Sequence, residues 1–96
     1  MSSKDISDEI KHLAYTFIKV SYERTGGELK KPLRFLDIYY DACTKIDGSN
    51  NKYETSLEIR QHVRDYLLKS GLIVVDPKEV NSIYLSQKAI NEYADY

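Results

Sequence analysis

The sequence predicts a single domain that is mainly α-helical, with one small β-hairpin towards its C-terminal end. Apolar residues recur at spacings of three and four over the first two thirds of the chain, which is the period of one helical face. A cluster of turn formers at 76–81 separates two short runs of β-forming residues, at 72–75 and 82–85. Ninety-six residues correspond to one domain, spanning 1–96.

The composition indicates a small cytoplasmic protein. Charged residues make up 30% of the chain but nearly cancel, with 14 basic against 15 acidic, so no global field draws it to nucleic acid or to a membrane. No run of about 20 apolar residues could span a bilayer, and the polar N-terminus is unlike a secretory signal. The single cysteine, Cys43, excludes an intramolecular disulfide and fits a reducing compartment.

The first predicted element is a helix from Ser3 or Ser7 to Thr25, ended by the glycines at 26–27. Its core-facing stripe consists of apolar residues at helical spacing: Ile6, Ile10, Leu13, Ala14 and Phe17. Three further residues widen this stripe on one side: Tyr15, Ile18 and Tyr22. They either line the edge of the core with their hydroxyls in water or contact a second subunit.

The second predicted helix has Pro32 in its first turn, where a missing N–H costs nothing, and ends at Gly48. Polar residues cover only about a third of its circumference. A helix this apolar is buried on most sides, either as a central core helix or against a second subunit. We expect a homodimer, because most soluble oligomers have two-fold symmetry. The expected contact combines the first helix, the C-terminal helix, Phe35 and Ile38.

The third predicted helix begins with a capping box, Thr55 to Glu58, and is closed by Gly71. Its inward face carries apolar residues at helical spacing: Ile59, Val63, Tyr66 and Leu67. We expect Val63 and Leu67 to be fully buried where this helix crosses the first two. The hairpin follows, and Ser86 then caps a final helix that contains Ile90, Tyr93 and Ala94.

Helix, short hairpin and helix, in this order over residues 55–96, resemble the second half of a winged helix-turn-helix domain. The resemblance implies a third helix in the major groove of DNA, with a hairpin wing beside it. The chain departs from the family pattern in a long polar loop at 47–52, and no strand is evident at 28–31, where the family has one between its first two helices.

The winged-helix resemblance implies double-stranded DNA as the partner. The positions that it assigns to DNA on the third helix are Ser56, Arg60, Gln61 and Arg64. Arginine and glutamine are the residue types that make bidentate contacts to guanine and adenine. Lys78 and Asn81 on the wing could touch phosphates. Lys30, Lys31 and Arg34 cluster at the N-terminus of the second predicted helix, where free amides favour anions. The segment 30–69 is also the net basic part of the chain, with eight basic and six acidic residues.

Residue patterns for catalysis or cofactor binding are lacking. His12, His62 and Cys43 are isolated, without the paired spacing of a metal site. The chain contains neither a phosphate-binding glycine loop nor a serine–histidine–aspartate arrangement. We therefore expect no enzyme activity, no catalytic residue, no metal and no cofactor.

Three functional classes stay open. The first, which we favour, is a small dimeric transcriptional regulator. The second is a winged-helix module that binds protein, which the near-neutral charge and the acidic residues Asp76 and Glu79 at the wing would suit. The third is a small helical bundle of the immunity-protein kind, although the β-branched run at 72–75 argues against it.

Overall fold

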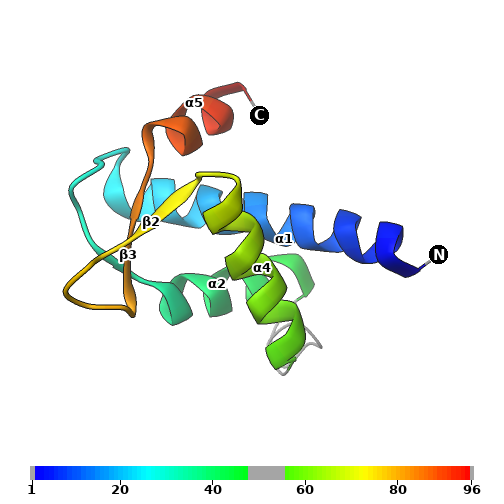
Figure 1. Ribbon diagram of the computed structural model, residues 1–96. Coiled ribbons are helices and arrows are strands. Elements are labelled where there is room, and N and C mark those ends of the chain that lie inside the picture. Colours follow the sequence, from blue (N-terminus) through cyan, green and yellow to red (C-terminus); the bar gives the residue numbers. More distant parts are fainter. Residues whose placement is uncertain (1, 48–55, 96) are drawn as a thin grey trace.

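A computed structural model describes residues 2–47 and 56–95 of the chain (Figure 1). The elements of these residues follow in the order α1 (Ser2–Thr25), β1 (Leu33–Arg34), α2 (Phe35–Asp47), α4 (Leu57–Lys69), β2 (Ile73–Val75), β3 (Ser82–Leu85) and α5 (Gln87–Asp95). The predicted fold class is confirmed: the protein is mainly α, with a small antiparallel sheet and a C-terminal helix. None of the described helices combines the length and the apolar character needed to cross a membrane.

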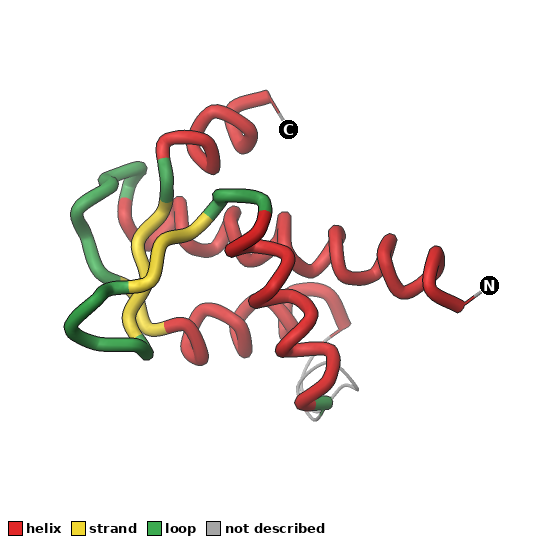
Figure 2. Tube along the Cα trace, viewed as in Figure 1, coloured by secondary structure: helices red, strands yellow, loops and turns green. Residues whose placement is uncertain are grey.

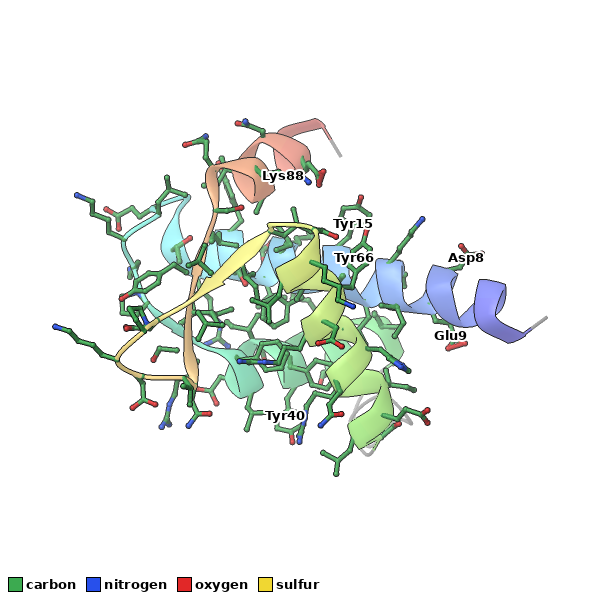
Figure 3. The ribbon with its side chains drawn as sticks, in the orientation of Figure 1. Asp8, Glu9, Tyr15, Tyr40, Tyr66 and Lys88 are labelled. Atoms are coloured by element: carbon green, nitrogen blue, oxygen red, sulfur yellow. The ribbon has the colours of Figure 1, made fainter. Side chains whose placement is uncertain are left out.

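Helix α1 is the longest element, and the others are arranged around it. Its 24 residues correspond to about 36 Å at 1.5 Å per residue, nearly the 37 Å of the longest dimension of the molecule. Helices α2 and α4 lie on one side of α1, the sheet lies near its C-terminal end, and α5 lies on the other side (Figures 1 and 2). The first turns of α1 extend past the other elements, and Asp8 points away from them (Figure 3).

The sheet contains the predicted hairpin and one strand that we did not predict. Strands β2 and β3 pair antiparallel, with Ile73 opposite Leu85. Strand β1 pairs with the other edge of β3, so the strand order is β1-β3-β2. Residues 28–31, where no strand was evident, are not in a strand; the strand before α2 lies at Leu33–Arg34, within the range expected for the second helix. A two-residue strand is too short to show an alternating pattern, and its pairing partner lies about 50 residues further along the chain.

The start of the second helix also differs from the prediction. Pro32 precedes strand β1, and α2 begins at Phe35. The backbone N–H of Phe35 donates to the carbonyl of Asn81, 3.1 Å away, so the helix begins where β1 meets β3. Pro32 therefore lies outside the helix that it was expected to begin.

The core forms where α1 meets α2, α4 and the inner face of the sheet. The predicted stripe of α1 is buried from Ile10 onward, and Val63 and Leu67 of α4 are completely buried, as predicted. Aromatic rings connect α1 to α2: the ring centroids of Phe17 and Phe35 are 5.1 Å apart, and those of Phe35 and Tyr39 are 5.9 Å apart.

Burial within the chain removes three of the five residues that we expected at a subunit interface. Ile18, Phe35 and Ile38 are buried inside the chain itself, so assigning them to a subunit interface is wrong. The reason is that α2 uses its broad apolar surface within the chain, as a central core helix does. Tyr15 and Tyr22 are half-buried at the edge of the core. The dimer itself stays a prediction.

Local capping signals account for the helix ends after residue 55. Ser56 is the N-cap of α4, and its side chain accepts from the N–H of Ile59 at 3.2 Å. Thr55, the cap that we predicted, lies outside the described residues, as does the loop at 48–52. Gly71 closes the helix with a φ of 72°, and Ser86 caps α5 by accepting from the N–H of Ala89 at 3.1 Å.

Candidate functional site

A cavity of about 390 Å³ lies between the first turn of α2, the outer face of α4 and the start of β3. Its polar lining consists of three arginines, two amides and one carboxylate: Arg34, Arg60, Arg64, Gln61, Asn81 and Asp37. Phe35 and Leu36, in the first turn of α2, supply the rest of the lining. We refer to this cavity as the arginine groove. It is the larger of two cavities that stand out in the described part of the chain.

Secondary structure brings these side chains together from distant parts of the sequence. Arg60 and Arg64, four residues apart, share one side of α4 that borders the buried stripe of Val63 and Leu67, and both are half-buried. Arg34 alternates with the inward-facing Leu33 on β1 and therefore belongs to the outer face of the sheet. Strand pairing places Arg34 opposite Ser82, next to Asn81.

Uncharged partners hold two of the three guanidinium groups. The guanidinium carbon of Arg64 lies 5.2 Å from the centroid of the Phe35 ring, a cation–π distance. Arg60 donates through Nη1 to the hydroxyl of Tyr40 at 3.1 Å, and Figure 3 shows Tyr40 on the side of the molecule where α2 and α4 lie. These contacts fix the orientation of both arginines without neutralising either charge.

Carboxylates offset little of the charge in the groove. The ion pairs of the described residues join Arg24 to Asp41 and Lys45 to Glu23, so neither includes an arginine of the groove. Asp37 is the single acidic residue in the lining, and three arginines against one aspartate leave a net charge of +2. The backbone amides at the start of α2 add a partial positive charge, because the first turn of a helix lacks intrahelical acceptors. The groove is therefore suited to an anion.

The structure brings four of the eight predicted DNA-contacting residues into this one site: Arg60, Gln61, Arg64 and Asn81. Ser56 acts instead as the cap of α4 and lines the second, smaller cavity of about 210 Å³. Lys30 and Lys31 are exposed in the segment before β1, and Lys78 is exposed in the wing turn. None of these three lysines lines the groove.

Sequence reasoning did not join Arg34 to the arginines of the third helix, and it missed the supporting roles of Phe35 and Tyr40. Arg34 was expected beside Lys30 and Lys31 at the start of the second helix, whereas it lies on β1. Phe35 was placed at a subunit interface, whereas its ring contacts Arg64.

Asp76 orders the turn of the wing. Its carboxylate accepts from the backbone N–H of Lys78 at 2.8 Å and from the hydroxyl of Tyr84 at 2.9 Å. The amide hydrogen bond first, and the tyrosine second, lower the pKa of Asp76, and the same carboxylate raises the pKa of Tyr84. The negative charge at the wing thus has a structural role in holding the turn.

No three His, Cys, Asp or Glu side chains within 2–47 and 56–95 are placed to hold a metal ion. Cys43 is buried in the core. Tyr39 is completely buried as well, and burial, followed by the neighbouring Cys43, raises the pKa of its hydroxyl well above the usual range.

Comparison with known proteins leaves the family open. No protein-family model matches this sequence, and neither the curated proteins nor the solved structures contain a significant match.

Proposed function

We propose that this protein is a small DNA-binding transcriptional regulator of the winged-helix type. The order of the elements supports the proposal, since three helices lead into a β-hairpin and β1 completes a three-stranded antiparallel sheet. In such an arrangement, α4 corresponds to the helix that enters the major groove. The observation that carries the proposal is the arginine groove, which gathers Arg60, Gln61 and Arg64 of α4 on one side of the molecule.

The chemistry of the groove suits DNA. Guanidinium groups make paired hydrogen bonds to phosphate oxygens and to the O6 and N7 atoms of guanine, and glutamine pairs in a similar way with adenine. The chain as a whole carries a net charge of −1, so attraction to DNA has to arise locally, from the side that holds Arg34, Arg60 and Arg64. A small number of phosphate contacts then gives binding that weakens with salt, but less steeply than for a strongly basic protein.

A homodimer on a two-fold DNA site completes the proposal. Helix α1, with α5 beside it, would supply the subunit contact, including the half-buried Tyr15 and Tyr22. Two copies would then present two α4 helices to successive turns of the major groove. Sedimentation at micromolar concentration should give about twice the 11.2 kDa mass of the chain, and a species of only that mass would contradict the dimer.

The DNA proposal is tested by fluorescence anisotropy on labelled duplexes drawn from around the gene itself, at about 50 and 200 mM salt. Arg64→Ala should lower the affinity for the specific site by about 1–3 kcal/mol if Arg64 reads a base. Lys45→Ala is the matched control, because Lys45 is an exposed residue of α2 that neither lines the groove nor belongs to α1 or α5, the helices of the proposed subunit contact. Absence of salt-sensitive binding to any duplex, or an equal loss in the control, would refute the proposal.

A protein-binding module is the second candidate, and the surface next to the groove favours it. Leu36 and Tyr40 are four residues apart on α2 and are 43% and 38% exposed. Apolar side chains beside uncompensated arginines suit a partner segment that carries both acidic and apolar residues. Binding that withstands DNA competitor and is lost in Leu36→Asp would favour this candidate over the regulator.

A further inference from the structure

We infer that the arginine groove is a preformed pocket for one phosphate group, and that a small phosphorylated molecule in this pocket competes with DNA. The inference concerns the same site as the proposed function and rests on it for the competition. The phosphate could belong to the DNA backbone or to a free phosphorylated compound, since the recognising chemistry is the same.

The site is a hollow of the size that small molecules occupy. A volume of about 390 Å³ lies within the range of roughly 300–1,000 Å³ that is typical of small-molecule pockets. A helix face that only lies along a DNA groove requires no such hollow. The concavity here arises because α2 begins beside β3, so that the first turn of α2 forms one wall and α4 forms the opposite wall.

Two of the arginines are already held in place before any ligand binds. The ring of Phe35 contacts the guanidinium of Arg64 and is itself packed in the core against the rings of Phe17 and Tyr39. Arg60 is held by the hydroxyl of Tyr40. Side chains that are already ordered lose less entropy when a ligand binds, which increases the affinity that a given set of hydrogen bonds provides.

The charge and the hydrogen-bond donors of the groove match those that a phosphate group requires. Three guanidinium groups and the amides of Gln61 and Asn81 provide hydrogen-bond donors around a single hollow. The net charge of +2, which Asp37 reduces from +3, matches a phosphate monoester that carries close to two negative charges at neutral pH. One phosphate group is therefore enough to balance the net charge of the hollow.

The test measures thermal stabilisation and NMR amide shifts of the full chain with inorganic phosphate, 2′-deoxyadenosine 5′-monophosphate, the corresponding triphosphate, and deoxyadenosine without phosphate. Ionic strength is kept constant with sodium chloride. We expect saturable shifts at the start of α2 and along α4 with phosphate, the monophosphate and the triphosphate, and no groove shift with the nucleoside. The monophosphate should also displace a labelled duplex.

Two arginine variants and a control assign the effect to the groove. Arg64→Gln and Arg34→Gln should each weaken phosphate binding about tenfold or more, since a hydrogen bond to a charged group is lost. Lys19→Gln removes the same charge from α1 and should leave binding unchanged. Circular dichroism melts show whether each variant is folded, and Arg34 and Arg64 come from different elements, so that one unfolded variant still leaves the other to decide.

The outcomes separate this inference from the proposed function. Duplex binding without any saturable response to phosphate or the monophosphate would overturn the pocket while the DNA proposal stands. Phosphate binding without duplex binding would support the pocket and refute the DNA proposal. An equal loss in Lys19→Gln and Arg64→Gln would overturn the pocket, because the effect would then be one of general charge. Simultaneous binding of monophosphate and duplex would refute the competition.

Discussion

Replacing Leu67 by alanine should remove a large part of the stability of this domain. Leu67 is completely buried on the inner side of α4, within the core formed with α1. Truncating a buried leucine costs about 2–5 kcal/mol, because the transfer free energy of the lost carbons is combined with the cost of the cavity left behind. A domain of this length has about 5–14 kcal/mol in total at 0.05–0.15 kcal/mol per residue. Each kcal/mol lowers the melting temperature by about 4–8 °C.

The matched control for Leu67→Ala is Leu57→Ala in the same helix. Leu57 lies in the first turn of α4 with 60% of its surface exposed, so its truncation should change the free energy of unfolding by less than about 0.5 kcal/mol. Urea titrations followed by circular dichroism at 222 nm give both values. Equal midpoints for the two variants would show that α4 packs through a different face from the one described.

Three further changes test other parts of the structure. Ser86→Ala should lower the free energy of unfolding in urea by about 0.5–2 kcal/mol. The substitution removes the cap of α5 and the hydrogen bond that Ser86 donates to the carbonyl of Gly71. An unchanged free energy of unfolding would argue against the cap. The hydrogen bonds of Asp76 lower its pKa below 3.8 in the folded state. The ionised Asp76 carboxylate therefore stabilises the folded state fully above pH 3.8, and this stabilisation is lost as the pH falls through the lowered pKa. NMR signals of Tyr84 should thus be constant from pH 7 to about 4 and change only below, and Asp76→Asn should remove this transition; a transition near neutral pH would contradict the assignment. Tyr40→Phe should weaken phosphate and DNA binding several-fold at unchanged thermal stability, because it frees the guanidinium of Arg60; unchanged binding would show that Tyr40 does not position Arg60.

The arginine groove shows how far a candidate site can be read from sequence. Gln61 and Arg64 were predictable as outward-facing residues of the third helix, with Arg60 at the border of that face, because helical spacing places them off the stripe of Val63 and Leu67. Asn81 was assigned to the wing, and the structure places it at the groove because the N–H of Phe35 bonds to its carbonyl. Arg34 was assigned to the second helix and not to this group, since its position depends on a strand of two residues.

Helix α2 shows which part of the core could not be predicted from the sequence. Its pattern was apolar on nearly every side, so periodicity could not distinguish a core helix from an interface helix. Packing against α1 decided this by burying Ile38 and Phe35, and it left Leu36 and Tyr40 exposed. The exposed pair lies on the same helix as the buried pair, and composition alone does not separate them.

The sequence by itself determined the elements whose signals lie within a few residues of one another. These are the length of α1, the position of the hairpin, the closure of α4 at Gly71 and the cap of α5 at Ser86, because caps, turns and periodicity act over single helical turns. The tertiary structure alone decided strand β1, the start of α2 and the joining of Arg34 to the arginines of α4. Each of these depends on the pairing of β1 with β3, a contact across about 50 residues that no local pattern records.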